Sequence, residues 1–283
     1  MRKYELHAHS NMSDGCESPS QVVARASEAG VKLLALSDHD CMLGIGEALE
    51  EGARRGVTVL PAIEIDAEFA GEEVHILGLG IDRLDARLNE EIAAQCARRR
   101  ERLERMAEAL LERDIDVRPA LRLSGGSVSR VDIALALIRM GLAESVADAF
   151  ERFLASGRFA NREFERMDAG KAVELINGAS GVAVLAHPCQ YDTDVGELVR
   201  VLKRHGLWGV EAYYLDATPE QAARFSALAA RCGLFVTCGS DYHGLSRRPR
   251  ARMGSAFVDN AATRRGYDAL VRKLGVEGLA YSD

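Results

Sequence analysis

The sequence lacks several features that would assign it to particular protein classes. It has no hydrophobic run near the ~20 residues that a membrane-spanning helix needs. Its first ten residues, MRKYELHAHS, contain no apolar signal core. None of its six cysteines forms a CxxC pair, so we expect free thiols rather than disulfides. We therefore expect a cytoplasmic protein with no membrane partner.

Lysine is scarce, and positive charge is in deficit. The 283 residues include 36 basic and 43 acidic side chains, and the net charge is −7. Only five of the basic residues are lysines; the other 31 are arginines. An acidic chain gains little from the nucleic-acid backbone, so we expect no long nucleic acid as a partner. A local basic pocket remains open, because the planar fork of arginine suits phosphate.

Short apolar runs alternate with helical stretches along the chain. Strands are predicted at residues 4–7, 31–37, 57–65, 74–79, 182–186, 208–213 and 234–238. This order implies an α/β fold with a parallel sheet and helices outside, and seven such units favour a closed or nearly closed barrel. A mainly helical, arginine-rich stretch interrupts the alternation. We therefore expect a barrel from residues 1–84 and 168–283, with a helical insertion, or cap, at 85–167.

Six of the seven histidines lie inside or just past the C-terminal end of a predicted strand. They are His7, His9, His39, His75, His187 and His243, and the acidic residues near them are Asp14, Asp38, Asp40, Glu64 and Asp241. The C-terminal ends of parallel strands converge in barrels and open sheets. These side chains should therefore gather in space. His205 precedes a glycine at the end of a predicted helix, where we expect a structural role.

This combination of residues favours a metal centre. The HxH pair, His7 and His9, places two imidazoles on one face of a strand, because side chains alternate. Six histidines and four or five carboxylates exceed the roughly three protein ligands of one catalytic zinc, which indicates two or three ions. Nitrogen and oxygen donors without cysteine suit Mn, Fe or Zn. A single buried histidine is as often a core residue, but six at strand ends favour the metal interpretation.

Six motifs, in order along residues 5–243, resemble those of the PHP family, the polymerase and histidinol phosphatase phosphoesterases. They are HAHSNMSDG, LSDHD, PAIEI, VHILGLG, AHP and GSDYH. The resemblance implies a distorted seven-stranded (β/α) barrel with a helical insertion. It also implies a metal-dependent hydrolase of phosphoric esters with two or three divalent ions, of which Mn²⁺ is the first choice and Fe or Zn the alternatives.

The resemblance further implies how the ligands divide. The first ion would be held by His7, His9 and Asp241. Glu64 would bridge the first and second ions, and His75 and His187 would complete the second. A third position would be formed by Asp14, His39 and His243, although Asp14 stands where some relatives carry histidine.

Catalysis would need a nucleophile, a proton donor and well-oriented ligands. Water between two cations would supply the nucleophile. The leaving alkoxide would take a proton from a group at the third position or from Asp241, so the candidates are Asp14, Asp241 and His243. Asp38 and Asp40 are expected to orient His39, with a structural role as the alternative for Asp40. The neighbouring Cys16, Cys41 and Cys189 are expected to be small hydrophobic fillers.

The insertion carries candidates for substrate binding. GGSVSR, at 125–130, opens a predicted helix whose free N–H groups suit an anion, so Ser127 and Arg130 could hold a second phosphate. Further candidate cations are Arg158, within the stretch 156–163, and Lys171. Residues 98–105 are predicted to form a solvated helical face with Arg–Glu pairs. RRPRAR, at 247–252, lines the site or forms a surface loop.

The layout resembles the PHP branch that contains 3′,5′-nucleoside bisphosphate phosphatases and exonucleases of short RNA. It implies a small nucleotide substrate with two phosphates, from which the 3′-phosphate is removed (pAp to AMP and phosphate, for example). Three alternatives remain open at this point. They are a 5′–3′ exoribonuclease on short oligonucleotides, a histidinol phosphatase, and a non-catalytic metal-binding module.

Overall fold

The computed structural model describes residues 3–123, 125–155, 157–161 and 164–276. Seven strands lie side by side in the order β1 (Lys3–Ala8), β2 (Val31–Leu36), β3 (Thr58–Phe69), β4 (Glu72–Leu79), β6 (Val182–Leu185), β7 (Gly209–Tyr214) and β8 (Phe235–Gly239). The short β5 (Met167–Asp168) pairs with β3. The residues after β8 return to β1, where the His9 N–H donates to the Tyr242 carbonyl at 2.7 Å. The predicted nearly closed, seven-stranded barrel is therefore confirmed.

One strand runs against the predicted direction. β4 is antiparallel to both of its neighbours, β3 and β6, whereas the other neighbouring pairs of the barrel are parallel. The cause is the short turn around Ala70 and Gly71, which makes β3 and β4 a hairpin and leaves no room for a crossover helix. As a result, the first residues of β4 lie at the same end of the barrel as the last residues of the parallel strands.

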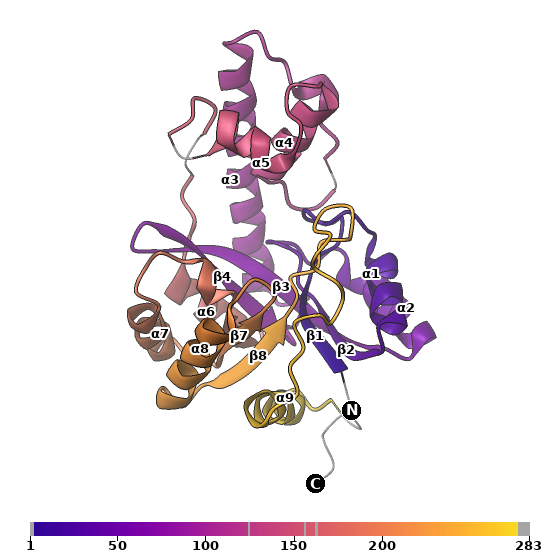
Figure 1. Cartoon of the computed structure of the whole chain (residues 1–283), viewed down its shortest axis with the longest axis vertical. Coiled ribbons are helices and arrows are strands. Elements are labelled where there is room, and N and C mark those ends of the chain that lie inside the picture. The colour runs from indigo at the N-terminus through magenta and orange to yellow at the C-terminus, as the bar shows by residue number, and fades with distance from the viewer. Residues whose placement is uncertain (1–2, 124, 156, 162–163, 277–283) are drawn as a thin grey trace.

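Helices cover the outside of the barrel (Figure 1). They are α1 (Pro19–Glu28), α2 (Ile45–Arg55), α6 (Ala169–Gly178), α7 (Val195–Arg204), α8 (Pro219–Arg231) and α9 (Ala261–Lys273). Ser18 begins α1 with a reciprocal capping box to Gln21, followed by proline in the first turn. The apolar face of α1 packs on β2, where Val22 and Leu34 are completely buried. No helix of the described ranges is long and apolar enough to cross a membrane.

A group of helices rises above one end of the barrel (Figure 1). It contains α3 (Ala86–Leu111), η1 (Arg118–Ala120), α4 (Arg130–Arg139), α5 (Val146–Ala149) and η2 (Phe150–Leu154). The second half of α3 packs Leu103 and Met106 against Ile133 of α4. The first half, with Leu88 and Ile92, belongs to the barrel's own core. The long helix α3 therefore contributes to both hydrophobic cores.

Candidate metal centre

The strand ends bring the predicted ligands together in one buried cup. His7 lies next to the last residue of β1, Glu64 lies in β3, and His75 lies in the first half of β4; the other members follow a strand. All six strand-end histidines are within reach of a neighbouring imidazole, with ring centroids 4.2–6.3 Å apart for the pairs that contact. The antiparallel direction of β4 explains why His75, in the first half of its strand, reaches the same cup.

Glu64 lies at the middle of the cup. Its Oε2 atom lies 3.1, 3.2 and 3.3 Å from ring nitrogens of His7, His9 and His39, and its Oε1 atom lies 3.0 Å from ring nitrogens of His75 and His187. The two oxygens of one carboxylate thus face two different groups of imidazoles. This arrangement suits a bridge between two cations.

Two more carboxylates complete the cluster. Asp241 Oδ1 lies 3.4 Å from His7 Nε2, 3.1 Å from His9 Nε2 and 3.4 Å from His243 Nδ1. Asp14 Oδ1 lies 3.0 Å from His243 Nε2 and 4.0 Å from His39 Nε2. The donor atoms therefore form overlapping groups, each compact enough for one ion: His7, His9, Glu64 and Asp241; His39, Glu64 and His75; and His9, Asp14, His39 and His243.

The donor atoms fit bound cations better than they fit one another. Glu64 Oε2, Asp14 Oδ1, His7 Nε2 and both ring nitrogens of His9 are buried without a hydrogen-bond partner among the described residues. A buried polar atom left without a partner costs about 1–3 kcal/mol. The donor set, imidazole nitrogens and carboxylate oxygens without sulfur, is the one that Mn, Fe and Zn accept. These residues therefore fit a cluster of divalent ions.

Opposite charges in the cup shift the pKa values of their neighbours. Burial alone would raise the pKa of Glu64, but the charges of His7, His39 and His75 outweigh it and hold that pKa well below its usual value. Burial would lower the pKa of His7, yet Glu64, Glu211 and Asp241 raise it well above normal. The carboxylates are thus ionised and ready to neutralise cations.

Backbone conformation at three strand ends is also unusual. Asp40, His187 and Asp241 have φ values of 45°, 23° and 52°. These values lie in the left-handed region of the backbone, which residues other than glycine rarely adopt. Such residues cost about 1–3 kcal/mol each and cluster at functional sites. Here the turned backbone directs His187 and Asp241 back into the cup.

Buried carboxylates outside the cup hold the imidazoles in place. Both oxygens of Glu211 lie 3.1 Å from His7 Nδ1, and Glu211 also accepts the backbone N–H of His187 at 2.9 Å. Asp66 Oδ1 lies 2.8 Å from His39 Nδ1. Neither residue was predicted, although both left a signal. Glu211 is an acidic residue inside an apolar strand, and Asp66 shares a strand face with Glu64.

The prediction that Asp38 orients His39 is wrong, and Asp40 has the structural role that was its alternative. Asp38 accepts hydrogen bonds from the backbone N–H and hydroxyl of Ser10 and from the hydroxyl of Ser13, all at 2.7 Å. Asp40 faces α3 instead, where it accepts from Gln95 and Arg99. The turned backbone at Asp40 points its side chain away from the imidazole beside it, and Asp66 takes the predicted role.

Two residues of the 247–252 segment reach the cup, so part of this loop lines the site. Arg248 Nη1 lies 2.5 Å from Asp241 Oδ2, and its other nitrogen donates to the Tyr214 hydroxyl at 2.8 Å. Tyr214 in turn donates to Asp241 Oδ2 at 2.9 Å. Arg247 Nη2 lies 3.6 Å from Asp14 Oδ2. Two predicted ligands at the rim therefore each have an arginine next to them.

A cavity of about 130 Å³ adjoins the cup. Its wall combines cup residues with the cap: Asp14, His39, Asp66, Glu73, His75, Arg99, Arg102, Ser129, Arg130, Val131 and Phe150. Arg99 and Arg102 are only 6% and 8% exposed, so the prediction of a solvated face over 98–105 is wrong for these two residues. Arg99 turns inward to Asp40 and Asp66, and Arg102 packs over the Phe164 ring.

The predicted substrate-binding residues differ in position. Arg130 begins α4 and lines the cavity. Ser127 is buried elsewhere, with its N–H bound to the Met12 carbonyl, because a close fit at Gly126 holds this loop against residue 12. Arg158 is exposed in the cap, and Lys171 pairs with Glu91 on α3 at 2.7 Å. Of the stretch 156–163, residues 156, 162 and 163 lie outside the described residues.

The structural roles of Cys41, Cys189 and His205 were expected. Burial raises the pKa of the Cys41 and Cys189 thiols to about 11 in each case, which keeps them protonated at neutral pH. Cys16 is exposed, with its sulfur 3.0 Å from the Ser246 hydroxyl. His205 pairs with Glu174 at 2.8 Å near the end of α7, remote from the cup.

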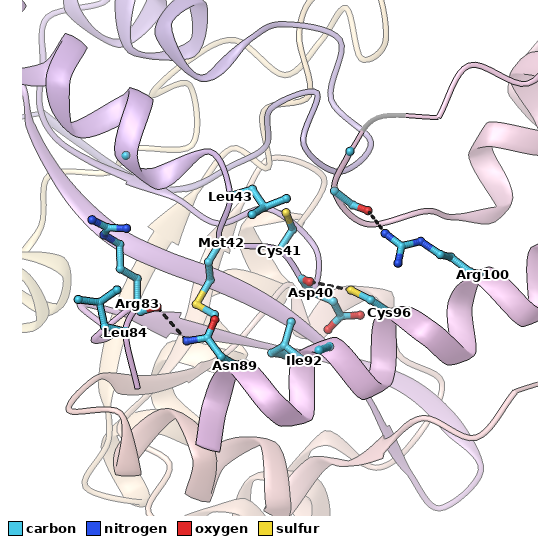
Figure 2. Close-up of a pocket in the computed structure, with 14 residues that line it drawn as sticks. Asp40, Cys41, Met42, Leu43, Arg83, Leu84, Asn89, Ile92, Cys96 and Arg100 are labelled. Carbon is cyan, nitrogen blue, oxygen red and sulfur yellow. Dashed lines mark hydrogen bonds between the residues drawn. The ribbon is translucent and has the colours of Figure 1, made fainter. Parts of the chain in front are cut away.

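A larger cavity, of about 510 Å³, lies between residues 40–43 and the first half of α3 (Figure 2). Its wall includes Asp40, one of the acidic neighbours of the strand-end histidines. Figure 2 shows Arg83 and Arg100 near opposite ends of it, and Cys96 beside Asp40. The Cys96 thiol donates to the Asp40 carbonyl at 3.2 Å. The segment that follows His39 is therefore packed directly on α3.

Comparisons with known proteins agree with this geometry. The model of the PHP domain family matches residues 5–161. The chain is 35% identical over 249 residues to the 5′–3′ exoribonuclease Rnm of Escherichia coli, covering 85% of each protein. It is 32% identical over 250 residues to the 3′,5′-nucleoside bisphosphate phosphatase of Chromobacterium violaceum, covering 86% of this chain and 88% of the relative.

Solved structures show the same fold. An amidohydrolase from Chromobacterium violaceum, solved with bound sulfate and no metal, superposes with a TM-score of 0.88 at 29% identity. A structure described as a metal-dependent phosphoesterase from Bifidobacterium adolescentis superposes with a TM-score of 0.82 at 27% identity. Each comparison covers 96% of both chains. Together with the buried cluster of metal-ligating side chains, these matches show that the chain belongs to the PHP family and is a metal-dependent phosphoesterase, a hydrolase of phosphoric esters.

Proposed function

We propose that this protein removes the 3′-phosphate from nucleoside 3′,5′-bisphosphates, such as pAp. The observation that supports this substrate is the arginine-walled cavity of about 130 Å³ beside the cup. A space of this size suits a second phosphate group rather than a nucleoside. The relative from Chromobacterium violaceum, whose name specifies a 3′,5′-nucleoside bisphosphate phosphatase, supports the same substrate class.

Several guanidinium groups crowd together on the cap side of this cavity. Burial and the nearby charges of Arg130 and Arg166 lower the pKa of Arg102 to about 9. Glu73 accepts a hydrogen bond from Arg130 at 3.3 Å and also forms an ion pair with Arg166, so one carboxylate is shared by two guanidinium groups. The first turn of α4 begins at the same wall, with Ser129 as its cap. A 5′-phosphate bound there would gain from both the arginines and the helix N-terminus.

The cup would hold the reacting phosphate. We propose that His7, His9 and Asp241 hold one ion, that Glu64 bridges it to a second held by His75 and His187, and that Asp14, His39 and His243 form a third position. When bound, the divalent ions, in our proposal Mn²⁺, supply Lewis acidity and lower the pKa of water. Glu211 and Asp66 keep the imidazole rings of His7 and His39 in a binding orientation.

The groups at the rim of the cup are best placed to donate a proton to the leaving oxygen. The side chains of Asp14, Asp241 and His243 are 15%, 11% and 11% exposed, whereas His7 and Glu64 are completely enclosed. Burial lowers the pKa of His243, but Asp14 and Asp241 raise it above its usual value. His243 Nε2 lies 3.0 Å from Asp14 Oδ1, so these two candidates form a pair at the rim of the cup.

The barrel and the cap would have different tasks. Residues 1–84 and 168–283 would form the catalytic barrel, and residues 85–167 the cap. The cap contributes Arg102 and Arg130 to the cavity, and the barrel contributes His39 and His75. Substrate selection would then reside largely in the cap and bond cleavage in the barrel.

A substrate panel tests the proposed function. Phosphate release would be measured with adenosine 3′,5′-bisphosphate, adenosine 3′-monophosphate, AMP and histidinol phosphate under identical metal conditions. The bisphosphate should have the highest kcat/KM, with the 5′-phosphate intact in the product. Equal kcat/KM values for the bisphosphate and the 3′-monophosphate would contradict the second phosphate site.

A second function, 5′–3′ exonuclease action on short RNA, is favoured by a further cavity. This space of about 310 Å³ lies on the other side of Asp14 and Val131, and its wall includes Arg122, Leu123 and Arg247. Apolar and cationic walls suit a second nucleotide attached to the reacting phosphate, and relatives in Escherichia coli and Salmonella typhimurium carry the exoribonuclease name. Turnover of 5′-phosphorylated oligonucleotides of two to six residues would favour this function if it exceeded turnover of the bisphosphate.

A further inference from the structure

Arg99 is a buried cation that none of the steps above uses. It lies at the middle of α3, is 6% exposed, and contacts three separate parts of the structure. Its Nε atom donates to Asp40 Oδ2 at 2.7 Å, and one terminal nitrogen binds Asp66 Oδ2. The other terminal nitrogen donates to the Val128 carbonyl at 3.2 Å. One guanidinium group therefore joins the barrel's strand ends to the loop that leads into α4.

Gln95, one helical turn earlier, strengthens the same connection. Its amide nitrogen donates at 2.7 Å both to Asp40 Oδ1 and to the Asp66 carbonyl. Its amide oxygen accepts the N–H of Met167 at 3.0 Å. Gln95 is completely buried. Two residues on one face of α3 thus fix the two carboxylates that follow His39 and Glu64 in the sequence.

Asp66 carries this connection to the cup. Its Oδ1 atom lies 2.8 Å from His39 Nδ1, while its Oδ2 atom is occupied by Arg99. His39 Nε2 is then directed toward Asp14, 4.0 Å away. Asp40 and Asp66 lie next to each other, since the Asp66 N–H donates to Asp40 Oδ1 at 3.2 Å. Without a cation between them, two buried carboxylates would repel and Asp66 would lose its fixed orientation.

We propose that Arg99 is a positioning residue that acts through Asp66 to hold His39 in place for the third metal position. The inference rests on the ligand role proposed for His39. Arginine suits this task better than lysine, because its planar fork reaches two carboxylates and a carbonyl from fixed directions. The cap helix α3 is then part of the metal centre's scaffold as well as a wall of the substrate cavity.

Titration of the metal-stripped protein with Mn²⁺ alone, followed by calorimetry, tests the proposal without any substrate. The variants are Arg99→Met and Arg99→Lys, with His39→Ala defining which ion depends on His39. Arg87→Met, at an exposed position of the same helix, is the matched control. Arg99→Met should weaken the His39-dependent ion by about 10- to 100-fold, as loss of an outer-sphere partner does. Arg87→Met should bind Mn²⁺ as the unmodified protein does.

A double variant separates positioning from general stability. If Arg99 acts through Asp66, Arg99→Met combined with Asp66→Asn should bind Mn²⁺ no more weakly than Asp66→Asn alone. Additive losses, equal weakening of all ions, or an unchanged titration would overturn the proposal. Arg99→Lys keeps the buried charge, so it provides the comparison if Arg99→Met fails to fold; it should still weaken the same ion.

Two results separate this proposal from those on which it depends. If His39→Ala leaves Mn²⁺ binding unchanged, the ligand assignment fails and this proposal fails with it. A failed bisphosphate preference in the substrate panel has no bearing on the titration.

Discussion

Replacing Arg130 tests how the protein chooses its substrate. Arg130 lies at the first position of α4, 28% exposed, with a terminal nitrogen 3.3 Å from Glu73 and its guanidinium carbon 5.3 Å from the centre of the Phe150 ring. In Arg130→Met the charge and its cation–π contact with Phe150 are lost, while methionine keeps an unbranched side chain that can pack on the ring. Glu73 retains Arg166 as a partner, so we expect the fold to persist.

The expected loss follows from the kind of bond removed. A hydrogen bond from a charged donor to an anion contributes about 1.5–3 kcal/mol, and each 1.4 kcal/mol is tenfold in rate or affinity. Arg130→Met should therefore lower kcat/KM for adenosine 3′,5′-bisphosphate by about 10- to 150-fold. Its kcat/KM for adenosine 3′-monophosphate, which has no 5′-phosphate, should stay within about twofold of the unmodified value.

The assay measures kcat/KM for both substrates on each variant. A loss of correctly folded protein lowers both values equally, so it does not change their ratio. Lys171→Met is the matched control, because Lys171 is also a cation near α3 but pairs with Glu91 and does not line the cavity. Equal losses on both substrates would show that Arg130 supports the fold or the metal centre instead. No loss on the bisphosphate would refute a second phosphate site at the start of α4.

Three further predictions concern metal binding and stability. Glu211→Gln should weaken Mn²⁺ binding by about 10- to 100-fold because Glu211 orients His7, whereas Glu174→Gln, at the surface pair with His205, should not; equal effects in a metal titration would contradict this. Free Mn²⁺ at about 100 times its Kd should stabilise the fold by about 2.7 kcal/mol per ion, and an unchanged Tm in calorimetry would count against binding to the folded state. Burial raises the pKa of Glu73, but His75 and Arg166 outweigh it and lower the pKa from 4.5 to about 2. The contribution of ionised Glu73 to the stability of the fold is thus full above pH 4.5 and is lost as the pH falls toward 2. In metal-free denaturant titrations Glu73→Gln should therefore reduce the acid dependence of stability in that range, and an unchanged dependence would contradict the shift.

The barrel and the gathering of the cup residues could be predicted from the sequence. Most of the short apolar runs ended in a histidine or carboxylate or were followed by one, and parallel strands bring such ends together whatever their distance along the chain. The direction of β4 could not be inferred from alternation alone. The direction depends on the tight turn at Ala70 and Gly71, and the overall β-then-α alternation does not indicate that this turn replaces a crossover helix.

The partners of the cup residues were harder to predict because they depend on packing. Asp38 and Asp40 flank His39 in the sequence, but backbone geometry sends their side chains elsewhere, and Asp66 comes from the neighbouring strand. Arg99 looked like one of many surface arginines on a charged helix. Its burial depends on where α3 crosses the strand ends, which sequence periodicity does not specify.

The most direct test of the metal-centre account is phosphate release by protein stripped with a chelator, measured before and after divalent ions are restored. The account predicts no hydrolysis of adenosine 3′,5′-bisphosphate by the stripped protein and recovery when Mn²⁺ is returned, with at least two ions bound per chain. Full hydrolysis without metal, or full activity with no bound ion, would contradict it.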